Sequence, residues 1–135
     1  MSEQDNIQIV QQLYAAFARG DAQAALDTLS DDVDFEHPMS TAVWPWAGKL
    51  RGREQIARFF AGLTETAEWE RFEPQEFIAQ GNRVMATVSE RLRLRSNGRL
   101  LDNEMVNLFT VEDNKIVRMR IYEDTAPIIA IIRGK

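Results

Sequence analysis

Cysteine is absent from this sequence of 135 residues, and histidine occurs only once, at His37. Without thiols the chain cannot form a disulfide, a thiolate metal site or a cysteine nucleophile. One imidazole is too few for the usual nitrogen-rich metal sites, so we expect no metal ion and no cofactor. Glycine-rich phosphate loops and the nucleophile elbow of hydrolases are also missing.

Basic residues are in the minority, with 16 Lys and Arg against 21 Asp and Glu, which gives a net charge of -5. A nucleic-acid surface needs clustered cations, so we expect no nucleic-acid partner. No apolar run is long enough to span a bilayer, and the N-terminus lacks the basic and apolar segments of a signal peptide. We therefore expect a cytoplasmic protein with no membrane partner.

Length and composition predict a single domain over residues 1–135. Apolar residues make up 44% of the chain and charged residues 27%, as in ordinary globular proteins. A chain of this length buries enough apolar surface for one core.

Apolar residues recur every three or four positions in the first part of the sequence, as on one buried face of a helix. This spacing predicts a first helix over residues 7–17, with Asp5 or Asn6 as its N-cap. A shorter second helix is expected to start at Asp21 and to include Leu29 on its apolar face.

A third helix is predicted over residues 53–63, after a short strand over 33–37 and a long loop over 39–50. The second half alternates like antiparallel strands and contains short turns, of which Asn97-Gly98 is the strongest hairpin signal. Further strands are expected at residues 68–79, 83–95, 100–111 and 115–123, followed by an apolar tail over 125–132. This order predicts an α+β fold, with three N-terminal helices packed on a curved sheet.

Strand alternation assigns two acids to the buried face of the sheet. Glu90 has the same parity as Val88, and Glu123 has the same parity as Met119 and Ile121. A buried carboxyl is costly unless it is hydrogen-bonded, and burial raises its pKa toward the range useful for acid–base chemistry. The alternative is that Glu90 lies where its strand bends outward and Glu123 at a solvated rim.

Several segments together have a familiar arrangement: VQQLYAAFARGD (10–21), LSDDV (29–33), GREQI (52–56) with Phe59-Phe60, NLFTVEDNKIV (107–117) and RIYED (120–124). They resemble the helices, first strand and closing hairpin of SnoaL-like polyketide cyclases and ketosteroid isomerases, within the nuclear transport factor 2-like superfamily. The resemblance covers nearly the whole chain. It implies a cone-shaped, curved antiparallel or mixed sheet around a pocket for a small apolar molecule.

The resemblance also implies a homodimer through the outer face of the sheet, with Val106 and Leu108 as candidate contacts. It specifies no reaction, because the superfamily includes isomerases, cyclases, epoxide hydrolases, dehydratases and proteins without enzymatic activity.

Three positions differ from ketosteroid isomerase, which uses a carboxylate base, a tyrosine and a protonated aspartic acid. His37 matches the position of the base, Leu13 that of the tyrosine and Asn107 that of the aspartic acid. Tyr14 is one step around the helix from Leu13, so we expect it to point elsewhere. Steroid isomerisation by the family's standard residues is therefore not expected.

The first functional hypothesis is a cofactor-free acid–base enzyme acting on an apolar carbonyl or polyketide-like compound. In it His37 is the base, Glu90 orients His37 or acts as the acid, and Asn107 holds the substrate oxygen. All three residues can equally be hydrogen-bonded structural groups. A short distance between His37 and Glu90 inside a closed cavity would favour catalysis.

The substrate is expected to contact apolar side chains of the sheet and an aromatic loop. Trp44 and Trp46 would form a lid that excludes water, although core filling or a dimer contact is a comparable reading. The remaining candidate substrate-binding residues are Val88, Phe109, Met119, Ile121 and Glu123.

Two other functions remain open. The same cone could hold an apolar ligand without any reaction, as a non-catalytic binding module. Epoxide hydrolysis in this superfamily relies on an Asp-Arg-Asp arrangement, which we rank lower because strand parity predicts no inward arginine.

Overall fold

The structure is a computed structural model that describes residues 2–39 and 47–134. Within these ranges the chain forms helices and strands in the following order. They are α1 (Glu3–Ala18), α2 (Ala22–Asp27), β1 (Leu29–His37), β2 (Gly48–Arg51), α3 (Arg53–Thr66), β3 (Ala67–Gln80), β4 (Arg83–Leu94), β5 (Leu100–Glu112), β6 (Lys115–Glu123) and α4 (Thr125–Ile132). None of the helices in these ranges has the length and apolar character needed to cross a membrane.

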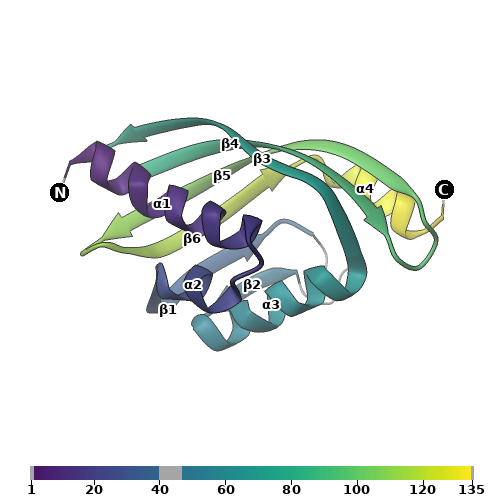
Figure 1. Ribbon diagram of the computed structural model, residues 1–135, viewed down its shortest axis with the longest axis horizontal. Helices are drawn as coiled ribbons and strands as arrows, with labels where there is room; N and C mark the ends of the chain where they lie inside the picture. Colours follow the sequence, from purple (N-terminus) through teal and green to yellow (C-terminus); the bar gives the residue numbers. More distant parts are fainter. Residues whose placement is uncertain (1, 40–46, 135) are drawn as a thin grey trace.

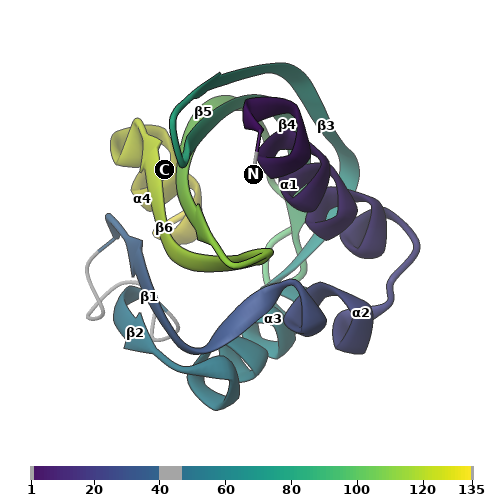
Figure 2. The same cartoon turned by 90° about the vertical axis from the view of Figure 1, so that its left-hand side faces the viewer.

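All six strands belong to one sheet with the order β2-β1-β6-β5-β4-β3. Strands β1 and β6 are parallel and the other neighbours are antiparallel, so the sheet is mixed. The sheet is strongly curved, but its edge strands β2 and β3 do not pair to close a barrel (Figure 2). The predicted α+β fold with a curved mixed sheet is therefore confirmed.

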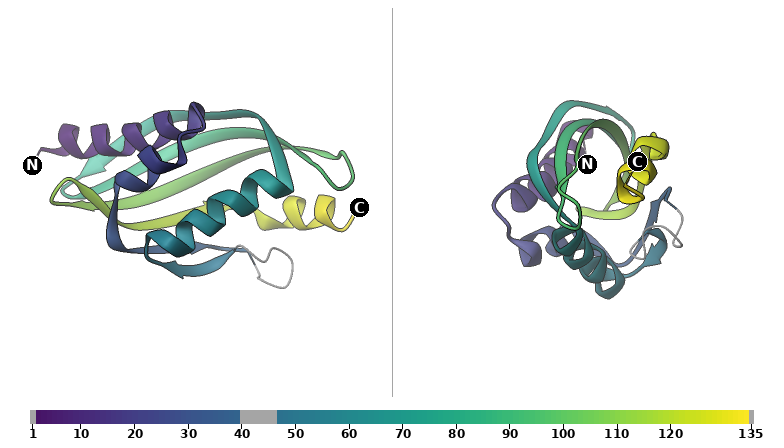
Figure 3. Two further views of the ribbon diagram at one scale, coloured as in Figure 1. Left: turned by 60° about the horizontal axis from the view of Figure 1, so that its bottom comes forward. Right: turned by 90° about the vertical axis from the view of Figure 1, so that its right-hand side faces the viewer.

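The helices cover the concave side and one end of the sheet (Figures 1 and 3). Helix α1 packs against β3 and β4, and α3 packs against β1 and β2. Helix α4, the predicted apolar tail, lies at the end of the molecule opposite the N-terminus and contacts β5. The largest fully buried side chains, Phe35, Phe109 and Leu13, come from β1, β5 and α1.

The N-cap of α1 is Ser2, so the predicted caps Asp5 and Asn6 are wrong. The Ser2 hydroxyl accepts from the Asp5 backbone N–H at 3.0 Å, and the Asp5 carboxylate accepts from the Ser2 backbone N–H at 3.2 Å. This reciprocal capping box gives two backbone N–H groups a hydrogen-bond acceptor. The helix therefore begins at Glu3, before the first residue of its apolar face. Asn6 is instead buried and donates to the Gly81 carbonyl at 3.2 Å.

Two predictions about the region after α2 are also wrong. Leu29 is the first residue of β1 and not part of the second helix, because it pairs with Ile116 of β6. The predicted loop over residues 39–50 contains the start of β2, which pairs with β1 from His37↔Gly48 to Asp34↔Arg51. The backbone groups of β1 on this edge thereby gain hydrogen-bond partners.

The four predicted strands of the second half are confirmed with small shifts at their ends. A two-residue turn joins β5 to β6, and both its residues, Asp113 and Asn114, have positive φ (51° and 64°). Such values match the type I′ turns that follow the natural twist of a hairpin.

Apolar residues form a row across the outer face of the sheet. In register order the row contains Ile78, Met85 and Leu108, and it ends at Arg120 of β6. Ile78 is 53% exposed, whereas Val106 and Leu108 are half-buried. The homodimer expected through this face stays a prediction.

Candidate functional site

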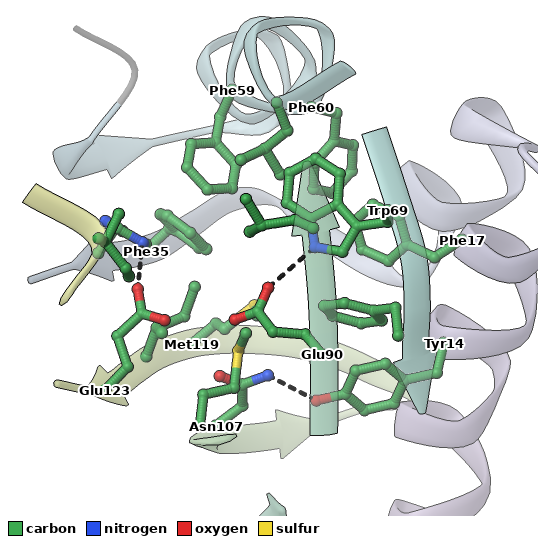
Figure 4. A pocket seen from close by; sticks show the side chains of 17 residues that line it. Tyr14, Phe17, Phe35, Phe59, Phe60, Trp69, Glu90, Asn107, Met119 and Glu123 are labelled. Carbon is green, nitrogen blue, oxygen red and sulfur yellow. Dashed lines mark hydrogen bonds and ion pairs between the residues drawn. The ribbon is translucent and has the colours of Figure 1, made fainter. Parts of the chain in front are cut away.

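The concave side of the sheet encloses a cavity of about 70 Å³ (Figure 4). Most of its wall is apolar and includes the rings of Phe17, Phe35, Phe59, Phe60 and Phe72. The groups in the wall that can form hydrogen bonds are those of Tyr14, His37, Trp69, Glu90, Asn107 and Glu123. An aromatic cavity with a few converging polar groups is typical of a small-molecule site.

Glu90 lies in the middle of β4 and points into this cavity, as strand parity predicts. It is only 3% exposed. One carboxylate oxygen, Oε1, accepts from the indole Nε1–H of Trp69 at 2.9 Å, and Oε2 accepts from the Nδ2 amide of Asn103 at 3.3 Å. These two donors come from β3 and β5, the strands on either side of β4.

Burial raises the pKa of the Glu90 carboxyl from 4.5 to about 7. The hydrogen bonds from Trp69 and Asn103 oppose this rise, while the nearby charge of Glu123 adds to it. Glu90 is therefore poised to take up or release a proton near neutral pH, which suits a general acid or base.

Glu123, at the end of β6, also lines the cavity, and it is the hydrogen-bond partner of His37. Its Oε1 lies 2.8 Å from the Nε2 of His37, and both side chains are buried. The Nδ1 of His37 accepts from the Met39 backbone N–H at 3.3 Å. A neutral His37 ring therefore carries its proton on Nε2 and donates it to Glu123.

Asn103 joins these groups into one hydrogen-bonded network. Its Nδ2 donates to Glu90 Oε2 at 3.3 Å and to Glu123 Oε2 at 3.1 Å. The network thus connects His37 to Glu90 through Glu123 and Asn103, where the sequence suggested a direct His37–Glu90 pair.

Tyr14 and Asn107 meet in the cavity wall below Glu90 (Figure 4). The Nδ2 amide of Asn107 donates to the Tyr14 hydroxyl oxygen at 2.7 Å. Asn107 is 1% exposed, and within the described part of the chain its Oδ1 has no hydrogen-bond partner. Burial raises the pKa of the Tyr14 hydroxyl far above its ordinary value, although the bond from Asn107 opposes this. Tyr14 therefore stays neutral and can donate its proton to a ligand oxygen.

The prediction that Tyr14 points away from the pocket is wrong. Helix α1 lies along the concave groove, so both Leu13 and Tyr14 are buried, at 1% and 5% exposure. The Tyr14 ring packs edge-on against Phe77 and Phe109, with ring centroids 6.0 Å apart in both pairs. A helix in a groove buries more than one stripe, which a single-face pattern does not predict.

The other proposed substrate-binding residues fall into three groups. Met119 and Ile121 line the cavity. Val88 and Phe109 are almost completely buried but are not part of the lining, so they support the wall from behind. Trp44 and Trp46 lie outside the described residues.

Asn103 and Trp69 are two site residues that the sequence reasoning missed. Asn103 has the same parity as Met105 and Asn107 on β5, so strand alternation could have assigned it to the cavity. Trp69 could not be found in this way, because register shifts at residues 69–71 and 74–76 break the alternation of β3.

No arginine lines the cavity within residues 2–39 and 47–134. The Asp-Arg-Asp arrangement expected for epoxide hydrolysis is thus not assembled by these residues. Arg91 of β4, whose side chain is on the opposite face, forms ion pairs with Glu70 and Asp102.

Comparison with known families relates this geometry to other proteins. The family model of the SnoaL-like domain matches residues 10–119, which include Tyr14, His37, Glu90 and Asn107. The chain belongs to this family. The resemblance to SnoaL-like proteins seen in the sequence is therefore confirmed.

Solved structures similar to this SnoaL-like domain share its fold along nearly the whole chain. An NTF2-like protein of unknown function from Burkholderia pseudomallei is 29% identical, with a TM-score of 0.88 and 98% of each chain covered. An NTF2-like protein from Burkholderia xenovorans is 35% identical, with a TM-score of 0.82 and 93% of each chain covered. TerC, co-crystallized with polyporic acid, is 27% identical, with a TM-score of 0.84 and coverage of 96% of this chain and 98% of TerC.

Proposed function

We propose that this SnoaL-like domain binds an apolar carbonyl or enol compound and transfers a proton on it without a cofactor. The observation that supports this most strongly is Glu90, a carboxyl with a pKa of about 7 in the wall of an aromatic cavity. Carboxyls whose pKa is strongly raised by burial in a cleft are candidates for functional sites.

Glu90 is a better candidate for the proton-transfer group than His37. Both nitrogens of the His37 ring are engaged, by the Met39 N–H and by Glu123. The Glu90 carboxylate accepts two hydrogen bonds but has further lone pairs, so it can still take a proton from a ligand. In this proposal His37 is a positioning residue that holds Glu123 and, through Asn103, the Glu90 carboxyl.

Tyr14 is suited to hold the substrate oxygen, and Asn107 orients the Tyr14 hydroxyl by donating to it. When Glu90 takes a proton from the carbon beside a carbonyl, the electron pair of that C–H bond moves into an enolate, whose oxygen accepts from the Tyr14 hydroxyl. Return of the proton from Glu90 to a different carbon gives an isomer. Attack of the enolate carbon on a second carbonyl of the same molecule gives a ring, after which the new alkoxide takes the proton from Glu90.

The similarity to TerC supports a small-molecule ligand in the cavity. That protein was co-crystallized with polyporic acid, and it shares 27% of its residues with this chain. The phenylalanine rings around the cavity would accommodate a flat ring by edge-on or offset contacts.

The alternative function is a binding module without a reaction. It is supported by the hydrogen bonds that Glu90 already accepts from Trp69 and Asn103. A hydrogen-bonded network of this kind can serve solely to hold buried polar groups in place, without taking part in a reaction.

Hydrogen–deuterium exchange on a carbonyl probe tests the proposal. The probe is 2-tetralone in D₂O, a flat ketone with acidic protons beside its carbonyl, followed by proton NMR with catalytic amounts of protein. We expect the wild-type protein to accelerate exchange and Glu90→Gln to reduce this acceleration by about 100-fold or more. Glu104→Gln is the matched control, because Glu104 is exposed on β5 and outside the cavity.

The two functions predict different outcomes. Equal rates for the wild-type protein, Glu90→Gln and the uncatalysed reaction, with 2-tetralone bound according to calorimetry, would contradict catalysis and support the binding module. Exchange that is lost equally in Glu104→Gln would show that the catalyst is not at Glu90.

A further inference from the structure

A second cavity, of about 200 Å³, which we call the outer cavity, lies between α1, α3 and β3 and adjoins the first, inner cavity. The two cavities share five residues, which we call the collar: Phe17, Phe60, Leu63, Trp69 and Phe72. The outer cavity adds Ala18 of α1 and Thr64 of α3. Because the same side chains line both spaces, the two cavities adjoin at the collar.

The inner cavity is too small to hold a ring on its own. Its volume of about 70 Å³ is well below the roughly 150 Å³ of an engineered protein cavity that binds benzene. A larger ligand would extend past the collar into the outer cavity, with which the inner cavity shares five lining residues.

The polar groups are concentrated at the inner end of this path. Asn107 Oδ1 is a buried acceptor without a partner in the described chain, and the Tyr14 hydroxyl beside it can donate. A hydroxyl or enol group satisfies both, since it donates to Asn107 and accepts from Tyr14. The outer cavity is lined mainly by apolar side chains, with the Thr64 hydroxyl bonded to the Phe60 carbonyl at 3.2 Å.

The collar itself favours a flat apolar body. The rings of Phe17 and Phe60 meet edge-on at 4.6 Å, and those of Phe17 and Phe72 lie 6.1 Å apart. Trp69 belongs to the collar and also donates to Glu90, so a ligand that passes the collar contacts the residue that holds the acid (Figure 4).

We infer that the ligand is an elongated molecule with a hydroxyl or enol at one end and an aromatic body, which reaches the inner cavity from between α1 and α3. The polar end lies beside Tyr14 and Asn107, and the body passes through the collar into the outer cavity. This inference rests on the proposed function and adds to it the ligand class and the direction of access.

Calorimetric binding of phenol and of 4-phenylphenol tests the inference with two variants of neighbouring residues on α3. Thr64→Phe fills the outer cavity, whereas Glu65→Phe adds the same ring at an exposed position outside both cavities. We expect the wild-type protein to bind 4-phenylphenol at least about tenfold more tightly than phenol, because the second ring buries further apolar surface. We expect Thr64→Phe to weaken 4-phenylphenol binding by about tenfold and phenol binding by less than about twofold, and Glu65→Phe to change neither.

Equal affinity of the wild-type protein for both phenols, or unchanged 4-phenylphenol binding in Thr64→Phe, would contradict this inference and leave the proposed function standing. Failure of both phenols to bind the wild-type protein would contradict the inference together with the proposed function. Loss of exchange in Glu90→Gln remains the separate test of the reaction.

Discussion

The protonation of Glu90 makes the stability of the protein depend on pH. Folding raises the pKa of this carboxyl from 4.5 to about 7. Between these pH values the folded protein keeps a proton that the unfolded chain has lost, so the free energy of unfolding falls as the pH rises. This contribution is fully present below about pH 4.5 and is lost above about pH 7.

We therefore predict that the difference in unfolding free energy between the wild-type protein and Glu90→Gln depends on pH. Relative to the variant, the wild-type protein should lose about 3 kcal/mol between pH 4.5 and pH 8. Urea unfolding at several pH values measures this difference, and a difference that stays constant would show that Glu90 does not titrate in this range.

The Tyr14 hydroxyl has a structural role as well as its proposed catalytic one. Removing it in Tyr14→Phe leaves the Asn107 amide buried without its acceptor, which should cost about 1–3 kcal/mol of unfolding free energy. Tyr122→Phe removes the same atom from a side chain that is 55% exposed, and it should change stability by less than about 0.5 kcal/mol. Similar losses in the two variants would argue against the buried Tyr14–Asn107 pair.

Single residues were predictable from sequence where a regular strand carries them. The alternation of β4 and β6 correctly predicted that Glu90 and Glu123 point into the cavity. It could not predict that His37 pairs with Glu123, since this contact joins β1 and β6, two parallel strands far apart in sequence. Tyr14 was misjudged because the orientation of α1 in its groove depends on the whole sheet.

At the scale of elements, α4 closes one end of the inner cavity. Ile128 of this helix lines the cavity, is 4% exposed and belongs to a cluster that includes Leu92, Leu94 and Leu101. The sequence predicted an apolar tail over these residues. The structure shows that it covers the cone.

Truncation of Ile128 should therefore destabilise the protein. We predict a loss of about 2–5 kcal/mol in unfolding free energy for Ile128→Ala, because the substitution leaves a cavity in a packed cluster. Leu100→Ala, a similar truncation at a position that is 38% exposed and outside the apolar row of the outer face, should cost less than about 1 kcal/mol. Denaturant unfolding of both variants checks this, and equal losses would contradict the role of α4 as a packed cover.

Elements with regular periodicity were predicted well, and irregular ones were not. The helices α1 and α3 and the strands β4, β5 and β6 follow from apolar spacing and turn residues. The edge strand β2 has four residues, which are too few to show an alternation. It forms because its backbone pairs with the edge of β1. The shifts in β3 likewise depend on its pairing with β4.

At the scale of the whole molecule, the outer face of the sheet is the surface on which a homodimer would form. Leu108 lies in the apolar row that begins at Ile78, which is 53% exposed, and this row faces away from the cavity. Burial of such a row against a second copy would remove apolar surface from water.

Light scattering coupled to size-exclusion chromatography tests this prediction. We expect the wild-type protein to have about twice the chain mass of 15.5 kDa, and Leu108→Asp to have the mass of one chain. Gln8→Asp, at an exposed position on α1, should leave the mass unchanged. A wild-type protein with the mass of a single chain would contradict the homodimer.

The central claim concerns Glu90 as a proton-transfer group inside the cavity, and the titration of its carboxyl carbon by carbon-13 NMR tests it most directly. The resonance is assigned by its loss in Glu90→Gln. The account predicts a midpoint near pH 7, with the carboxyl protonated below it. A midpoint near 4.5, the ordinary value for glutamate, would mean that Glu90 is hydrated and charged at neutral pH and would contradict the proposed chemistry.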